Sequence, residues 1–115
     1  MTIDQLVARF AEIGIAQDEA LLYDEHKKFR LLYSQMDEVD KELRRRGPEA
    51  RLALIQLFDH PNMQVRLQAA KWSMGIAPDA ARQVIESISE SNWFPQAGDA
   101  GMTLWSLDEG IFKPD

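Results

Sequence analysis

The stretch Pro48–Gly75 constrains the fold more than any other part of the chain, because its pattern predicts two short helices joined by a tight turn. Pro48 suits the first position of a helix, where its missing N–H would lack an intrahelical partner anyway. Apolar side chains then cover more than half of the helix circumference, so we expect neighbours on two sides. These side chains are Leu52, Leu54, Ile55, Leu57 and Phe58.

The second helix of this hairpin follows the turn Asp59-His60-Pro61-Asn62, where Asn62 can cap its N-terminus. Two of its faces are apolar, and small alanines on both allow neighbouring helices to approach closely. A polar strip remains for function, and we predict it as part of a partner surface: Gln64, Gln68 and Lys71. One apolar face holds Val65, Ala69, Trp72 and Ile76, and the other holds Met63, Leu67, Ala70 and Met74.

Two helices are predicted before this hairpin. Thr2 and Gln5 have the spacing of a capping box, so the first helix covers about 3–13, with Gly14 as its stop. A second, long helix covers about 18–46, because no glycine or proline interrupts that stretch. Residues 1–47 would then cap the N-terminal side of the hairpin.

The predicted long helix carries an apolar stripe, Leu22, Phe29, Met36 and Leu43, with a spacing of seven residues. A seven-residue spacing is also typical of a coiled-coil seam between two chains. We favour an internal stripe, because Leu21 and Tyr33 widen it beyond a narrow seam. The chain is therefore predicted to be a monomer or a homodimer.

A second, looser hairpin is predicted over 77–110, followed by a tail at 111–115. Its first helix begins at Pro78, and its return helix covers about 99–109, with Met102, Leu104, Trp105 and Leu107 directed inward. The loop between them contains Trp93 and Phe94. These two side chains either plug the end of the helical stack or form an exposed anchor for a partner, a role in which tryptophan is enriched.

The run HPNMQVRLQAAKWSM resembles the second helix of HEAT and armadillo-like repeats in its turn proline, Val-Arg pair and small-residue pair. The matching residues are Pro61, Val65, Arg66, Ala69 and Ala70. His60 and Ser73 depart from the pattern, since such repeats usually have Asp and Leu there. The resemblance implies an all-α domain over 1–115, built as a short stack of about six helices around the hairpin 48–76.

The whole chain also resembles a small bacterial family known only as a domain of unknown function, number two thousand and nineteen. The resemblance rests on AQDEALLYDE, HPNMQVRLQAAKW, PQAGDAGM and LDEGIFKP, and it extends over nearly the full length. It implies an armadillo-like helical fold. It implies no activity, because the family carries no established reaction.

The residues that carry chemistry are few. There is no cysteine, and neither His26 nor His60 lies in a metal-binding spacing, so we expect no metal, no cofactor and no catalytic residue. Both histidines are predicted to face solvent or to cap the ends of nearby helices.

No apolar run approaches the ~18 residues of a membrane span, and the first residues lack a secretory pattern, so we expect a cytoplasmic protein.

Charge separates the two main hypotheses for function. The first is a non-enzymatic protein-interaction domain that uses Gln64, Gln68, Lys71, Trp93 and Phe94. The alternative is nucleic-acid binding through the basic cluster Arg44, Arg45, Arg46 and Arg51. The net charge of −6 opposes binding to a phosphate backbone, and the same arginines are favourably placed at a helix C-terminus, so we favour the first. A small hydrolase is the least favoured possibility.

Overall fold

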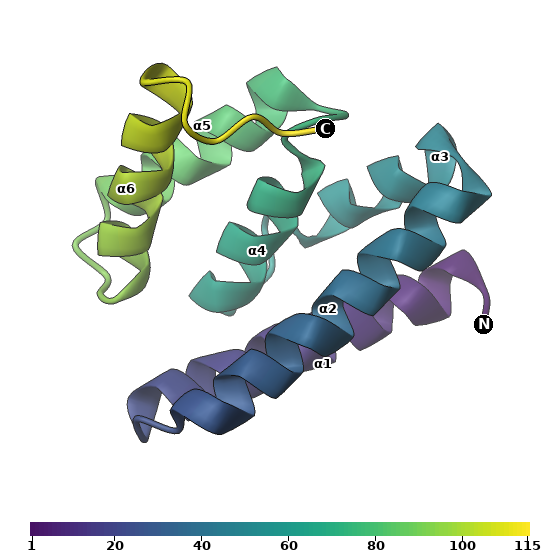
Figure 1. Cartoon of the computed structure of the whole chain (residues 1–115), viewed down its shortest axis with the longest axis horizontal. Coiled ribbons are helices and arrows are strands. Elements are labelled where there is room, and N and C mark those ends of the chain that lie inside the picture. The colour runs from purple at the N-terminus through teal and green to yellow at the C-terminus, as the bar shows by residue number, and fades with distance from the viewer.

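The computed structural model describes residues 1–115 and contains six α-helices, one 3₁₀ helix and no strand (Figure 1). This confirms the prediction of an all-α fold with about six helices. The helices form a compact bundle with an N-terminal hairpin, a central helix and a C-terminal hairpin. Their bounds are α1 Ile3–Leu22, α2 His26–Arg46, α3 Pro48–Leu52, η1 Ala53–Leu57, α4 Met63–Ser73, α5 Pro78–Ser89 and α6 Gln96–Asp108.

The predicted division of the N-terminal part was wrong. Helix α1 continues through Gly14 to Leu22, and the chain turns between α1 and α2, where Asp24 has a φ of 56°. Gly14 is buried against α4, and a Cβ at this position would lie 2.8 Å from Val65 Cγ2. Gly14 therefore serves close packing of two helices. The real break carries neither glycine nor proline, because an aspartate tolerates the left-handed conformation.

Several helix starts agree with the sequence. Thr2 and Gln5 form the predicted capping box, and Asn62 Oδ1 accepts a hydrogen bond from Val65 N at 3.1 Å. Pro48 and Pro78 each occupy the start of a helix. Local capping chemistry alone was sufficient to place these starts.

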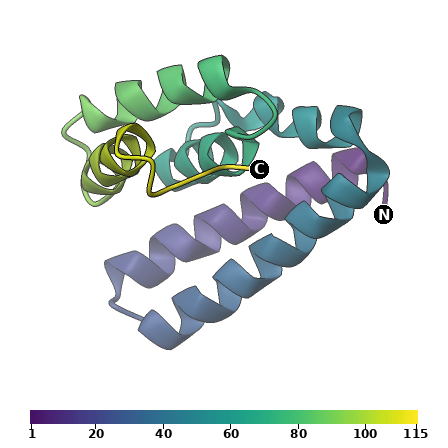
Figure 2. The ribbon, with the colours of Figure 1, turned by 45° about the horizontal axis from the view of Figure 1, so that its top comes forward.

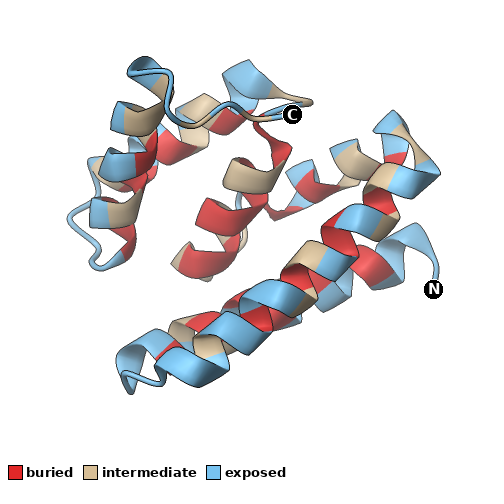
Figure 3. Ribbon diagram, viewed as in Figure 1, coloured by how far each residue is buried: buried red, intermediate tan, exposed pale blue.

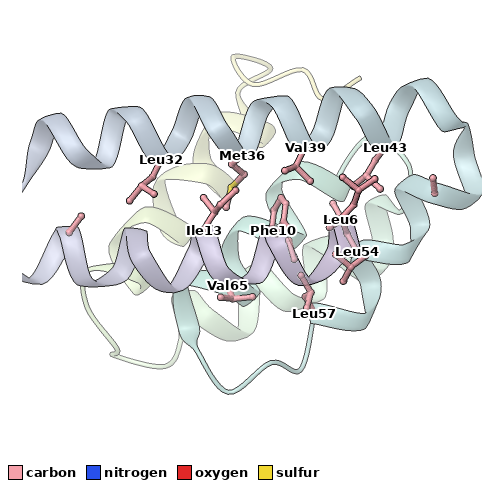
Figure 4. Close-up of a cluster of buried hydrophobic side chains, with 14 residues drawn as sticks. Leu6, Phe10, Ile13, Leu32, Met36, Val39, Leu43, Leu54, Leu57 and Val65 are labelled. Atoms are coloured by element: carbon pink, nitrogen blue, oxygen red, sulfur yellow. The ribbon is translucent and has the colours of Figure 1, made fainter. Parts of the chain in front are cut away.

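The apolar stripe of α2 is internal. Leu32, Met36, Val39 and Leu43 are buried, and Figure 4 shows them directed at Phe10 and its neighbours on α1. Phe29 is half-buried against the same cluster, whereas Leu22 lies at the α1 terminus with 76% of its surface exposed. The stripe therefore joins α1 to α2 within one chain, and only Leu22 departs from the predicted pattern.

Helix α4 lies between two apolar cores (Figure 2). Val65 and Ala69 belong to the core formed with α1, α2, α3 and η1. Leu67, Ala70 and Met74 belong to the core formed with α5 and α6. The two apolar faces predicted for this helix are thus confirmed, and the alanines allow close contact on both sides.

Helix α6 begins at Gln96, earlier than predicted, and turns a different face inward. Its buried side chains are Gln96, Ala97, Ala100 and Thr103, which are small or can form hydrogen bonds. Met102 and Trp105, both predicted to point inward, are exposed, while Leu104 and Leu107 are half-buried against the second core (Figure 3). Small residues allow α6 to approach its neighbours closely, which leaves the larger ones outside.

None of the helices is long and apolar enough to span a membrane.

Candidate functional site

A groove lies between α2 and α6, with α4 as its floor and the C-terminal tail at one end. Its volume is about 350 Å³. Figure 1 shows the tail leaving α6 and passing the C-terminal end of α4. Helix α2 contributes Tyr33 and Arg44 to its lining, and α4 with the turn after it contributes Gln68, Lys71, Trp72 and Gly75. Helix α6 contributes Met102, Thr103 and Ser106, and the tail contributes Phe112, Pro114 and Asp115.

The apolar part of the groove is built from aromatic rings and a methionine. The rings of Tyr33 and Trp72 pack at a centroid distance of 5.6 Å and a tilt of 46°. Trp72 is half-buried against the first core, so its ring has a fixed position, whereas Tyr33 is exposed. Met102 lines the groove from α6 and is also exposed. Side chains of these types contribute much of the binding energy at protein interfaces.

Polar groups are also present in the groove. Lys71 Nζ lies 3.1 Å from Asp99 Oδ1, and Thr103 Oγ1 donates to the main-chain oxygen of Asp99 at 2.9 Å. Gln68 Oε1 is buried and has no hydrogen-bond partner. A buried acceptor without a partner is costly in free energy, but this oxygen lies beneath the surface and is out of reach of a ligand in the groove.

Two of the four arginines of the predicted basic cluster lie at the tail end of the groove. Arg44 Nε donates to Asp40 Oδ2 at 2.6 Å, and Arg44 Nη2 lies 3.0 Å from Asp115 Oδ1. Arg51 Nη1 donates to the main-chain oxygen of Asp115 at 3.2 Å. Burial raises the pKa of the Asp40 carboxyl above its usual value, against the opposing effect of Arg44.

The other two arginines of the cluster point elsewhere. Arg45 and Arg46 both hydrogen-bond to Glu42, and their hydrogen bonds lower the pKa of Glu42 to about 2. Arg44, Arg45 and Arg46 are therefore paired with carboxylates, and Arg51 with the main chain of the tail. The cluster is not a free basic patch, so it offers little support for the nucleic-acid alternative.

Comparison with known proteins identifies the family. A family model described as a domain of unknown function, DUF2019, matches residues 4–108. The chain belongs to this family. A search of the curated proteins found no match. Among solved structures, the chain is similar to the crystal structure of the protein RPA1889 from Rhodopseudomonas palustris CGA009, with 51% sequence identity and a TM-score of 0.95 over 100% of this chain and 95% of that chain.

These findings confirm the family resemblance seen in the sequence. They support the helical architecture of this DUF2019 domain over its whole length. They attach no activity to it, and the more specific resemblance to HEAT and armadillo repeats gains no support from them.

The predicted polar strip of α4 was largely wrong. Gln64 and Gln68 are 2% and 3% exposed, so neither can form an outer surface. Gln64 Nε2 donates to Gln17 Oε1 at 3.1 Å, and Gln64 Oε1 accepts from Gln96 Nε2 at 3.0 Å. A primary amide can be buried when other amides satisfy it, which the sequence pattern does not reveal. Lys71 alone among the three lies at the rim of the groove.

Trp93 and Phe94 are 61% and 68% exposed, so the interpretation that they plug the helical stack was wrong. The Phe94 ring lies 3.8 Å from the position that a Cβ on Gly98 would occupy. Met102 and Trp105 follow Gly98 at helical spacing and share its outward face. We call Phe94, Met102 and Trp105 the α6 stripe, and Met102 connects this stripe to the groove.

The two histidines lie in turns outside the groove. His26 Nε2 lies 2.8 Å from Asp24 Oδ1 at the exposed turn between α1 and α2. His60 Nδ1 accepts a hydrogen bond from Asn62 N at 3.0 Å in the turn before α4. Neither imidazole lines the groove, so neither is close to the Thr103 and Ser106 hydroxyls that line it.

No group of three His, Asp or Glu side chains has the arrangement needed to hold a metal ion.

The sequence reasoning missed Tyr33, Met102 and Asp115 as members of one site. Tyr33 had been noted only because it widens the α2 stripe, and Met102 had been assigned to the core. One signal was available: the tail Phe112-Lys113-Pro114-Asp115 combines an aromatic ring, a rigid proline and an acid after the last helix. The position of this tail against Gly75 depends on contacts between segments that are distant in sequence, and no local pattern predicts such contacts.

Proposed function

We propose that this domain is a non-enzymatic interaction module that binds a segment of a protein partner in the groove between α2 and α6. The observation that carries the proposal is the groove itself. It combines the exposed Tyr33, the ring of Trp72 and the exposed Met102 with Lys71 at its edge. The rings suit apolar side chains of a peptide, and the Lys71 ammonium can donate to a carbonyl or carboxylate oxygen of the same peptide.

The surroundings of the groove favour a macromolecular partner over a small molecule. Met102 continues the groove into the α6 stripe, and Trp93 lies on the loop before α6. Contiguous exposed apolar side chains of this size are typical of interaction surfaces. A stack of helical hairpins that presents a groove is also what the resemblance to helical repeats implies.

We further propose that the protein acts in a bacterial cytoplasm.

A site-specific photocrosslinker tests the proposal in the native cells. Benzoylphenylalanine replaces Met102 in the groove and, in a matched control, the exposed Glu12 on α1. We expect a discrete protein adduct from position 102 and none from position 12. Adding Tyr33→Ala to the position 102 variant should reduce the adduct at least about tenfold, as for an interface hot spot. Equal adducts from both positions, or none above background from position 102, would contradict the proposal.

A further inference from the structure

The tail 111–115 is an extended segment that runs from α6 back toward the C-terminal end of α4 (Figures 1 and 2). It lines one end of the groove. The main-chain N–H groups of Ile111 and Phe112 donate to Ser106 O at 2.9 and 3.1 Å, which sets the direction in which the tail leaves α6. Phe112 and Pro114 then line the groove. The tail therefore places an aromatic ring, a proline and an acid in the site that we propose for a partner.

The acid meets a pair of arginines. Asp115 Oδ1 lies 3.0 Å from Arg44 Nη2, and its main-chain oxygen accepts from Arg51 Nη1 at 3.2 Å. The tail therefore places a carboxylate oxygen on Arg44 and a main-chain oxygen on Arg51. Guanidinium groups prefer carboxylate acceptors, so this pair suits an acidic segment.

The hold on the tail is weak enough for exchange. The Asp115 side chain is 87% exposed, and exposed ion pairs contribute little to stability. Ile111 and Lys113 are also exposed, so the tail is covered on one side only. A segment that makes similar apolar contacts and presents a carboxylate to Arg44 would replace it.

We propose that Arg44 and Arg51 form a carboxylate-recognition site for an extended acidic peptide segment of the partner, which residues 111–115 occupy within the chain until it binds. This inference rests on the proposed function and specifies the chemistry of its partner. The expected ligand pattern is an apolar side chain followed within a few residues by Asp or Glu.

Two side chains of the tail provide a way to release it without altering the arginines. Asp115 pairs with Arg44 and Phe112 lines the groove, so the double variant Phe112→Ser/Asp115→Ala should release the tail. Gly75→Ala blocks the site instead, because a Cβ there would lie 2.4 Å from the carbonyl carbon of Asp115 and a bound segment would meet the same methyl group.

The test measures binding of a labelled peptide by fluorescence anisotropy. The probe is GIFKPD, the sequence of 110–115, with a fluorophore at its N-terminus and an amide at its C-terminus. We expect Phe112→Ser/Asp115→Ala to bind it at least about tenfold more tightly than the wild type, because the wild-type tail competes for the same site. The peptide GIFKPN should bind this double variant at least about tenfold more weakly, and adding Arg51→Ala to the double variant should weaken GIFKPD similarly. Adding Gly75→Ala to the double variant should also weaken GIFKPD, because the new methyl group occupies the place of the terminal Asp.

Hydrogen exchange of the Ile111 and Phe112 amides reports whether the tail has left. If exchange shows release in the double variant and GIFKPD binds no better than to the wild type, the inference is wrong. Equal binding of GIFKPD and GIFKPN also overturns it. If exchange shows no release, deletion of residues 111–115 takes the place of the double variant under the same criteria. A position 102 crosslink without peptide binding leaves the proposed function standing and rejects only the carboxylate site.

Discussion

The two helical hairpins that pack on opposite sides of α4 use their large apolar side chains differently. The α1–α2 hairpin buries Phe10, Ile13, Met36 and Leu43 completely, and α1 meets α4 at Gly14. Helix α6 instead packs through small side chains and leaves Met102 and Trp105 outside. The first hairpin packs mainly through large side chains, although it also leaves Leu31 and Tyr33 exposed, whereas α6 packs through small side chains and directs two large ones toward solvent.

A chain of buried amides connects the two hairpins. Gln17 of α1, Gln64 of α4 and Gln96 of α6 are hydrogen-bonded in sequence, and Gln96 Nε2 also donates to Asp18 Oδ1 at 3.1 Å. Hydrogen bonds require specific geometry, whereas apolar contacts are less directional. The amide chain therefore specifies how the hairpins sit relative to each other, and with them the two walls of the groove.

The largest expected effect comes from breaking this chain at its centre. Gln64→Ala removes the hydrogen bonds to Gln17 and Gln96 and leaves a cavity at a buried position, so we expect a loss of about 3 kcal/mol in the free energy of unfolding. Urea denaturation followed by circular dichroism measures it. Gln83→Ala, at an exposed position of α5, is the control and should change stability by less than about 0.5 kcal/mol. Similar losses from both variants would show that the amide chain has no special role.

The next effect tests the close contact between α1 and α4. Gly14→Ala places a methyl group 2.8 Å from Val65 Cγ2 and 3.2 Å from Val65 Cα, so α4 must shift. Overpacking of this kind should outweigh the better helix propensity of alanine and lower stability by about 2 kcal/mol. The same denaturation experiment on Val65→Ala and on the double variant measures the coupling. Strictly additive effects would mean that the two residues do not clash.

The corresponding change in the second hairpin should have the opposite sign. Nothing lies within 4 Å of a Cβ on Gly101, which is exposed near the middle of α6 and has no positive φ. Gly101→Ala should therefore raise stability by about 1 kcal/mol through helix propensity. Thermal unfolding gives the value. A destabilisation would indicate that the outer face of α6 is packed in solution, for example against another chain.

The smallest effect concerns the arginine end of the groove. Because the pKa of Asp40 is raised in the folded state, the folded protein binds more protons than the unfolded chain just above the ordinary value of 3.8, and stability falls as pH rises through this window. Asp40→Asn removes that titration. Urea denaturation from pH 3.5 to 7 measures the free energy of unfolding of both proteins. The value for the variant relative to the wild type should rise by about 1 kcal/mol or less across this range. A difference that does not change with pH would contradict the assignment.

The parts of the fold that sequence predicted depend on short-range chemistry. The capping box at Thr2, the cap at Asn62 and the helix starts at Pro48 and Pro78 each involve residues within one helical turn. The two apolar faces of α4 follow from helical spacing. The errors at Gly14 and in α6 arose because a glycine or alanine has no side chain that shows which neighbour it faces.

The candidate site could be predicted only in pieces. Lys71 was named from the sequence as part of a partner surface, and Arg44 and Arg51 were named for nucleic-acid binding. Trp93 and Phe94 were named with two possible placements. The groove appears when Tyr33, Trp72, Met102 and Asp115 come together from four segments of the chain. Such positions depend on the packing of whole helices, so spacing within one helix carries no information about them.

The sequence by itself determined the helical class, most helix starts and the family. It favoured an internal stripe on α2, but only the tertiary structure decided that this stripe packs on α1. The tertiary structure also decided that Gln64 and Gln68 are buried, that Met102 and Trp105 of α6 face outward and that the tail lies on two arginines. The physical reason is that a local pattern records which side chains avoid water. Which polar groups find partners, and which apolar groups remain outside, is settled by contacts between segments distant in sequence.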